Sequence, residues 1–185
     1  MTTVHTYLPS EITERELRAV CKLVWQTWTW KDSLEEAFAE FKSNTLESAR
    51  KGEGRQRFIV WEGDQVVAHA AIFSREVHTK HGTLRLGALT GVCAHADYRG
   101  HRLGSRVVRA AFDLVDQGEF SVILWQTTVP KFYEKLGARI VDNTWVNSHN
   151  AENPKADPWP DELKMIYPAD YAWPDGQIDL NGPVY

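Results

Sequence analysis

One stretch of the sequence, residues 92–105, constrains the fold more than any other. An apolar strand pattern ends at Ala94, a turn carries Arg99, Gly100 and Gly104, and an amphipathic helix pattern then runs to about Gln117. Glycine allows a close approach of the backbone to a ligand, and a helix start offers unpaired N–H groups at the positive end of a dipole. The turn is therefore a candidate site for an anion such as phosphate. An ordinary strand-to-helix connection would have the same two glycines, so the surrounding pattern has to decide.

The segments on either side of this turn predict a mixed sheet. Strand patterns at 58–61, 66–77 and 83–94 are separated by short polar turns, which predicts an antiparallel meander. After the helix, the nearly continuous apolar run 120–125 is typical of a strand buried on both faces. The order strand, helix, strand implies a crossover, and hence a parallel pair beside the meander.

Helix patterns flank these strands, which predicts an α/β (α+β) fold. Helix periodicity follows Ser10 and Ser33, and a short helix begins at Pro130 and ends at Gly137. Further strand candidates cover 4–8, 140–147 and 163–167.

Length and composition indicate one domain, residues 1–185, in which 168–185 form an extended tail with apolar residues to bury. The net charge of −4 has no long single-sign run, which argues against nucleic acid as a partner. We find no signal peptide pattern and no apolar run near the roughly 20 residues that span a bilayer. Cys21 and Cys93 fit buried thiols in a reducing compartment, so we expect a cytoplasmic protein without a metal or a membrane partner.

Two motifs in this order resemble the GNAT superfamily of acetyl-CoA-dependent N-acetyltransferases. The family signature is Arg or Gln, two residues, Gly, one residue, then Gly or Ala. The run Arg99-Gly100-His101-Arg102-Leu103-Gly104 matches it at the first and last positions, with Arg102 where glycine is usual. The run Asp97-Tyr98-Arg99-Gly100 and the later run Phe132-Tyr133-Glu134-Lys135-Leu136-Gly137 also match the family. The resemblance extends from about Val4 to Tyr167.

The resemblance implies a GNAT-like mixed central sheet and a site for acetyl-CoA. Backbone groups of Val92, Cys93 and Ala94 would pair with the pantetheine arm. The pyrophosphate would be held by the turn Arg99, Gly100, His101, Arg102, Leu103, Gly104 and Ser105. Arg102 would either point away from the phosphates or bend over them as an extra cation. Gln126 and Thr127 lie where relatives place an Asn that contacts CoA.

The resemblance also implies direct transfer of the acetyl group to an amine, with Tyr133 as the general acid for the CoA thiolate. A nucleophilic role for Cys93 is the less favoured alternative. The general base is less defined, because residues 84–94 contain no carboxylate. His69 is one candidate, although its alternation with Val67, Ala71 and Phe73 is more typical of a core histidine.

Several tryptophans are candidates for an aromatic acceptor pocket, and core packing is the alternative for each of them. They are Trp25, Trp28 and Trp145. The leading hypothesis is an N-acetyltransferase acting on a small-molecule amine. The alternatives are a non-catalytic acyl-CoA-binding sensor or a protein lysine or N-terminal acetyltransferase. Many relatives are dimers, so a homodimer is one expectation.

Overall fold

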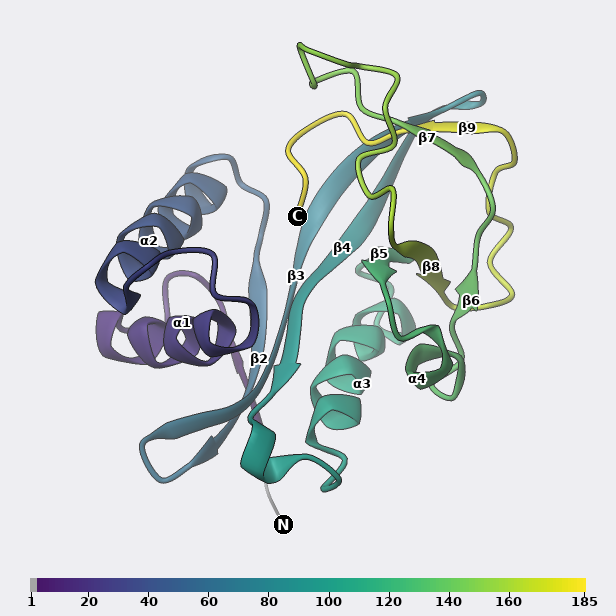
Figure 1. Ribbon diagram of the computed structural model, residues 1–185. Helices are drawn as coiled ribbons and strands as arrows, with labels where there is room; N and C mark the ends of the chain where they lie inside the picture. The colour runs from purple at the N-terminus through teal and green to yellow at the C-terminus, as the bar shows by residue number, and fades with distance from the viewer. Residues whose placement is uncertain (1–2) are drawn as a thin grey trace. The chain divides into compact units, whose positions relative to one another are not determined.

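A computed structural model describes residues 3–185 and contains a mixed sheet with helices beside it (Figure 1). In chain order the elements are β1 (Val4–Tyr7), α1 (Glu14–Trp28), α2 (Leu34–Arg50), β2 (Gln56–Glu62), β3 (Gln65–Thr79), β4 (Gly82–Ala94), the 3-10 helix η1 (Ala96–Tyr98), α3 (Leu103–Asp116), β5 (Ile123–Thr127), α4 (Pro130–Glu134), β6 (Arg139–Ile140), β7 (Thr144–Val146), β8 (Leu163–Tyr167) and β9 (Gln177–Asp179).

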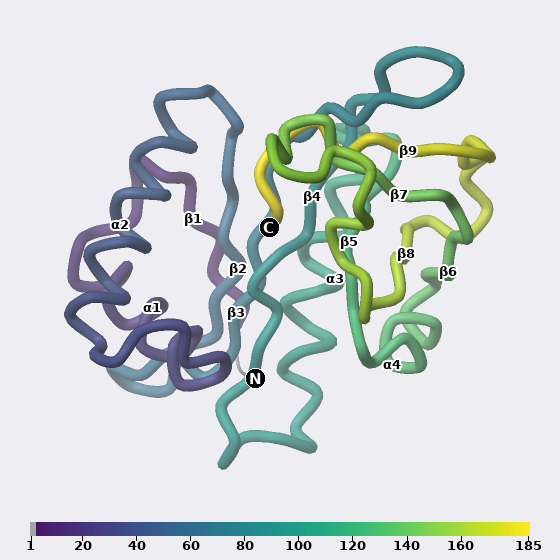
Figure 2. The backbone as a smooth tube through the Cα atoms, turned by 45° about the horizontal axis from the view of Figure 1, so that its top comes forward, coloured from purple at the N-terminus to yellow at the C-terminus, as the bar shows by residue number. Residues whose placement is uncertain are grey.

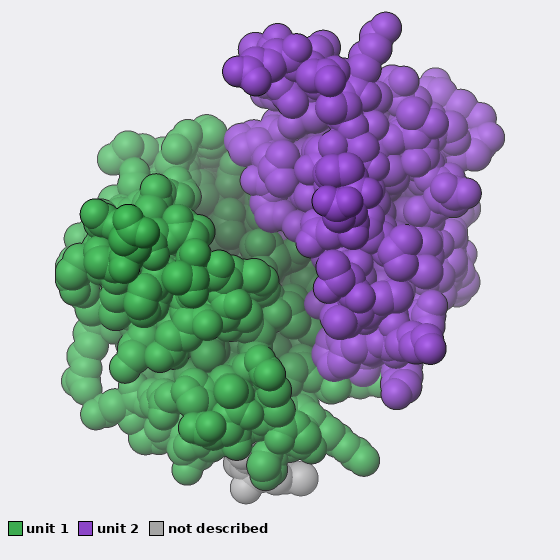
Figure 3. All heavy atoms as spheres, in the orientation of Figure 1, with its two compact units in different colours: residues 1–73, 89–113 green, residues 74–88, 114–185 purple. Residues whose placement is uncertain are grey.

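The chain forms two compact units, which Figure 3 distinguishes by colour. Unit 1 consists of residues 1–73 and 89–113, and unit 2 consists of residues 74–88 and 114–185. The long strands β3 and β4 each contribute one part to either unit.

In unit 1, helix α1 packs between strands on one side and α2 on the other. Its residues Val20, Leu23 and Val24 form a buried cluster with Ile59 of β2, Val66 of β3 and Cys93 of β4. A second cluster joins Leu17 and Cys21 of α1 to Ala37 and Phe38 of α2. The two helices accordingly lie side by side in the tube view as well (Figure 2). This packing buries the apolar stripe that the helix periodicity of α1 predicts.

Unit 2 contains the parallel pair. Gly87 and Ala88 of β4 lie opposite Ile123 and Leu124 of β5. Strand β8 pairs antiparallel with both β5 and β6. The short strand β9 pairs antiparallel with β3 and parallel with β7, as Figure 1 shows.

The expected mixed sheet is confirmed, with an antiparallel run from β1 through β2 to β3, a β3–β4 hairpin, and a parallel pair of β4 and β5. One predicted strand is wrong in detail. Residues 140–147 do not form a single strand: β6 ends at Ile140 and pairs with β8, whereas β7 begins at Thr144 and pairs with β9. Asn143, between them, donates its side-chain amide to the carbonyls of Pro174 and Gly176 in the tail.

Helix α1 begins with a reciprocal cap that can be tested. The Thr13 hydroxyl accepts the N–H of Glu16 at 3.3 Å, and the Glu16 carboxylate accepts the N–H of Thr13 at 2.8 Å. We expect Thr13→Ala to lower the free energy of unfolding by about 1 kcal/mol in urea denaturation, because the N–H of Glu16 loses its acceptor and the Glu16 carboxylate loses the Thr13 hydroxyl donor. Ser10→Ala, three residues upstream and outside the cap, is the control and should leave stability unchanged. Equal effects of the two substitutions would contradict the cap.

Candidate functional site

The turn before α3 lies in unit 1 and presents free backbone donors. Within η1, Tyr98 N–H bonds to His95 O and Arg99 N–H to Ala96 O. The first helical hydrogen bond of α3 then runs from Arg106 N to Arg102 O at 3.2 Å. The N–H groups of Leu103, Gly104 and Ser105 therefore precede any i→i−4 acceptor and are available to an anion.

Arg102 adopts the backbone conformation that glycine favours. Its φ is 58°, in the left-handed region, and the preceding Gly100 has a φ of 85°. The Arg102 side chain is exposed. A residue with a Cβ is strained here, which gives a physical reason why glycine is usual at this position of the signature.

The stretch Val92, Cys93 and Ala94 ends strand β4. Cys93 is buried in the unit 1 core, and burial raises the pKa of its thiol to about 12. A thiol that stays protonated at neutral pH is a poor nucleophile. This favours Cys93 as a core residue over the alternative of covalent catalysis.

His69 lies in the interior of unit 1 and uses both ring nitrogens. It is 1% exposed, with Nδ1 2.7 Å from Gly91 O and Nε2 3.2 Å from Arg57 Nη1. A carbonyl only accepts and a guanidinium only donates, so Nδ1 carries the proton and Nε2 accepts. Burial and the Arg57 cation lower the pKa of His69 to about 3. This arrangement favours the core role of His69 over that of a general base.

Arg57 completes the same buried network. It is 4% exposed, it donates to Thr45 Oγ1 at 3.0 Å, and its guanidinium carbon lies 4.8 Å from the centre of the Phe41 ring. Among residues 3–185, no carboxylate forms an ion pair with it. Burial lowers the pKa of Arg57 to about 9, so its side chain remains charged at neutral pH. Its hydrogen-bond acceptors, Thr45 Oγ1 and His69 Nε2, are uncharged.

Tyr133 and Thr127 belong to unit 2. Tyr133 lies in α4, is 5% exposed, and its ring centre is 4.9 Å from that of Trp125 and 4.8 Å from that of Phe132. The Thr127 hydroxyl accepts the N–H of Val129 at 3.0 Å and so supports the turn into α4. Gln126 donates its side-chain amide to the carbonyl of Tyr185.

The three candidate acceptor tryptophans are in different surroundings. Trp28, at the end of α1, is 53% exposed. Trp25 is half-buried and donates its indole N–H to the carbonyl of Lys31 at 3.0 Å. Trp145 is buried in unit 2, where its ring contacts those of Trp159 and Trp173. Core packing accounts for Trp145, and Trp28 alone of the three presents a large exposed ring.

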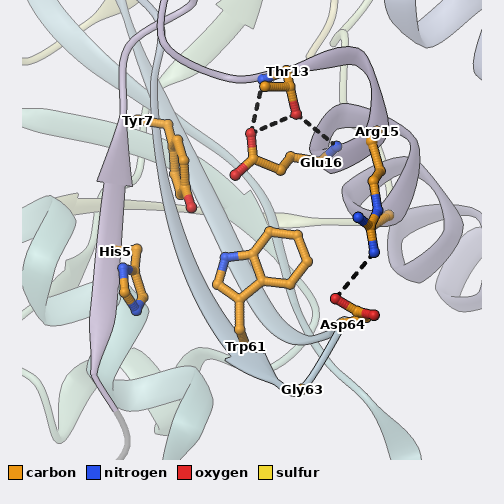
Figure 4. A pocket seen from close by; sticks show the side chains of 9 residues that line it. His5, Tyr7, Thr13, Arg15, Glu16, Trp61, Gly63 and Asp64 are labelled. Atoms are coloured by element: carbon orange, nitrogen blue, oxygen red, sulfur yellow. Dashed lines mark hydrogen bonds and ion pairs between the residues drawn. The ribbon is translucent and has the colours of Figure 1, made fainter.

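Unit 1 also has a cavity of about 440 Å³, and none of the candidate site residues lines it. Figure 4 shows Tyr7, Trp61 and Glu16 around it, beside the ion pair between Arg15 and Asp64. The Glu16 carboxylate is already held by the cap of α1. Three of the charged side chains that line the cavity are therefore already engaged, those of Arg15 and Asp64 with each other and that of Glu16 with the helix cap.

Two residues of the His69 network escaped the sequence analysis. Gly91 lies inside an apolar strand pattern. Glycine at such a position commonly marks a bulge, so the sequence could have predicted an irregular backbone here. Arg57 directly precedes the apolar run 58–61. A basic side chain at the end of a strand pattern normally predicts exposure to solvent. Its burial depends on α2 covering it, which no local pattern indicates.

Residues 3–185 contain neither a candidate metal site nor a candidate membrane-spanning helix. No group of His, Cys, Asp and Glu side chains could hold a metal ion in that part of the chain. None of its helices is both long and apolar enough to pass through a bilayer.

A family model described as an acetyltransferase (GNAT) domain matches residues 9–141, more than half of the chain. The chain belongs to the GNAT acetyltransferase family. Membership makes it an acyltransferase by family, and the matched range contains both the turn at 99–105 and Tyr133.

Solved GNAT structures share this fold at low identity. YhbS of Escherichia coli, a GNAT family N-acetyltransferase in complex with CoA, is 13% identical with a TM-score of 0.63, over 98% of this chain and 91% of that one. Glucosamine-6-phosphate N-acetyltransferase from Arabidopsis thaliana is 17% identical with a TM-score of 0.58, over 76% of this chain and 94% of that one.

Some neighbours are much longer. A GCN5-related N-acetyltransferase from Kribbella flavida is 19% identical with a TM-score of 0.60, over 75% of this chain but 33% of that one. A probable N-acyltransferase from Enterococcus faecalis is also matched over 33% of its length. The chain thus spans about a third of these two proteins, and at such identities the likeness concerns the fold alone.

The buried His69 should make stability depend on pH. Its folded pKa of about 3 lies below the ordinary 6.5, so between these values the unfolded state binds the extra proton and stability rises with pH. Arg57 and Arg55 are the charged groups that disfavour its protonation. We expect His69 to contribute a fall of roughly 2 kcal/mol to the free energy of unfolding from pH 7 to pH 5.

The measurement is urea denaturation at both pH values. In His69→Asn this part of the pH dependence should disappear, whereas His81→Asn, in the exposed β3–β4 turn, should behave as the wild type. An unchanged slope in His69→Asn would contradict the buried neutral imidazole.

The left-handed backbone of Arg102 gives a second prediction. Arg102→Gly should raise the free energy of unfolding by up to about 1 kcal/mol, because strain is relieved at the start of α3. Arg102→Val should lower it, because a β-branched side chain is least tolerated at positive φ. Urea midpoints of the two variants would be compared with the wild type. The opposite order would show that this turn has another conformation in solution.

Proposed function

We propose that this protein is an acetyl-CoA-dependent N-acetyltransferase acting on a small-molecule amine. The observation that carries the proposal is the turn of unit 1, in which the N–H groups at the start of α3 are free and a family signature covers the same residues. The free, buried cysteines Cys21 and Cys93 support a reducing compartment, so we expect the enzyme to be cytoplasmic.

Acetyl-CoA supplies an activated thioester, whose carbonyl carbon the acceptor amine attacks. Backbone N–H groups from Gly100 to Ser105 hold the pyrophosphate, whereas the N–H of Arg99 is already bonded to Ala96 O. Backbone groups of Val92, Cys93 and Ala94 hold the pantetheine arm. A backbone N–H near Val92 or Ala94 donates to the carbonyl oxygen as it gains charge. The carbon–sulfur bond then breaks, Tyr133 protonates the thiolate, and the amine proton leaves to solvent.

The chemistry of the residues supports direct transfer. The raised pKa of the Cys93 thiol disfavours an acetyl-cysteine intermediate. A phenol with an ordinary pKa of about 10 is a suitable acid for a thiolate. His69 is not assigned the base, since its Nε2 already accepts from Arg57.

The proposal is tested by isothermal titration with acetyl-CoA, followed by an amine panel with thiol release as the signal. The panel includes an amino sugar phosphate, since one structural neighbour is a glucosamine-6-phosphate N-acetyltransferase. No binding at high micromolar acetyl-CoA would overturn the proposal. Binding without turnover on any amine, including a peptide lysine and a peptide N-terminus, would favour a non-catalytic acyl-CoA sensor.

Gly104→Asp tests the phosphate turn. Asp is favourable in the first turn of a helix, so the fold should survive, but its negative charge would repel the pyrophosphate. We expect acetyl-CoA affinity to fall by at least about tenfold, as for the loss of one charge-assisted hydrogen bond. Gly104→Ala is the matched control, because the family signature accepts Ala there, and it should bind nearly as the wild type. Normal affinity in Gly104→Asp would mean that the turn is misassigned.

Tyr133→Phe tests the general acid. Removing the hydroxyl should lower turnover by about 100-fold, which is typical of losing a general acid, while the acetyl-CoA affinity changes little. Turnover is followed by thiol release and affinity by titration. Phe132→Leu, which changes the adjacent ring without touching the hydroxyl, is the control. An unchanged rate in Tyr133→Phe would remove Tyr133 from the mechanism.

A further inference from the structure

Strand β4 runs without a break from Gly82 to Ala94, but its backbone leaves the extended conformation at Gly91, immediately before the stretch proposed to meet the cofactor. Gly91 has a φ of 61°, far from the extended values of a strand. A glycine in this conformation is typical of a β-bulge, which bends a strand and re-aims the residues that follow. Those residues are Val92, Cys93 and Ala94. Whatever fixes the backbone at Gly91 therefore fixes the direction of this stretch.

The group that holds Gly91 is His69. Its Nδ1–H donates to the Gly91 carbonyl at 2.7 Å, which is short for a hydrogen bond of this kind. The ring also abuts the glycine: a Cβ placed on Gly91 would lie 3.1 Å from His69 Cε1 and 3.3 Å from Nδ1. The contact is thus both polar and steric.

The ring of His69 is in turn fixed from its other side. Nε2 accepts from Arg57 at 3.2 Å, and Arg57 is anchored to α2 through Thr45 Oγ1 and the face of Phe41. A ring rotation would break both hydrogen bonds of His69, and leaving these buried polar groups unpaired is costly. The chain of contacts runs from α2 through β2 and β3 to the bend of β4, and all of it lies in unit 1.

We propose that His69 is a positioning residue that, held by Arg57, sets the bend of β4 at Gly91 and so orients the backbone of Val92–Ala94 for the pantetheine arm. The cofactor part of this inference rests on the proposed function, whereas the bend itself does not. A positioning role at this place should change the affinity for acetyl-CoA and leave the KM for the acceptor amine unchanged.

Three variants test the cofactor part. His69→Leu removes both hydrogen bonds and should weaken acetyl-CoA binding by about tenfold, the effect of losing one buried hydrogen bond. His69→Asn retains an amide N–H near the position of Nδ1 and should bind within about threefold of the wild type, a partial rescue. Leu17→Ala, in the core between α1 and α2, lowers stability without contacting β4, and its affinity should match the wild type.

A double-mutant cycle tests the bend without any cofactor. Gly91→Ala should lower the urea midpoint strongly in the wild type, where its Cβ meets the imidazole, and less in His69→Ala, where this contact is absent. Equal effects in both backgrounds would overturn the contact between His69 and the bend.

The two arms separate the possible failures. If the wild type binds no acetyl-CoA, both the proposed function and the role of His69 in cofactor binding are overturned. The double-mutant cycle still tests whether His69 contacts the bend at Gly91. If the wild type binds and His69→Leu binds equally well, or if Leu17→Ala weakens binding as much as His69→Leu does, the positioning role is overturned while the proposed function stands.

Discussion

The contacts of the buried Arg57 guanidinium connect helix α2 and the strands of unit 1 around His69. A charge removed from water is tolerated only when its donors find acceptors, and here those acceptors are a threonine hydroxyl, a neutral imidazole and an aromatic face. The hydroxyl and the aromatic face belong to α2 and the imidazole to β3, so the cation, which lies in β2, joins α2, β2 and β3. His69 extends the same network to β4 through the Gly91 carbonyl. His69 stays neutral because burial lowers the pKa of its imidazole, and the neighbouring Arg57 cation lowers it further.

The sequence indicated most of the fold because most elements carry their own periodic signal. The meander, α3 and the short helix α4 follow from alternation, helix spacing and turn residues, although α4 ends at Glu134 and not at the predicted Gly137. The division of residues 140–147 into β6 and β7 did not follow, because it depends on pairing with the distant strands β8 and β9. No shift in composition separates the two compact units, since β3 and β4 pass through both of them.

The candidate site divides in the same way. The turn at 99–105 and the motif around Tyr133 are local patterns, and a family model covers both. The role of His69 is not local: the alternation of β3 places it on an apolar face, but the two partners that occupy its nitrogens come from β2 and β4. Trp145 shows the same limit, because its contacts with Trp159 and Trp173 join segments far apart in the chain.

Arg102 shows why a departure from a signature need not remove the function behind it. At the position where the signature has glycine, the backbone of Arg102 enters the left-handed region with a φ of 58°, a conformation that glycine adopts most easily. The donors offered to an anion are the N–H groups of the following residues, whose directions depend on that backbone and not on the side chain. An exposed arginine in the same conformation therefore keeps the donor geometry, adds a positive charge near it, and loses only the ease with which glycine adopts the turn. Recognition through the backbone is tolerant of sequence for this reason, which makes the conformation at 102 a better guide to the turn than the residue found there.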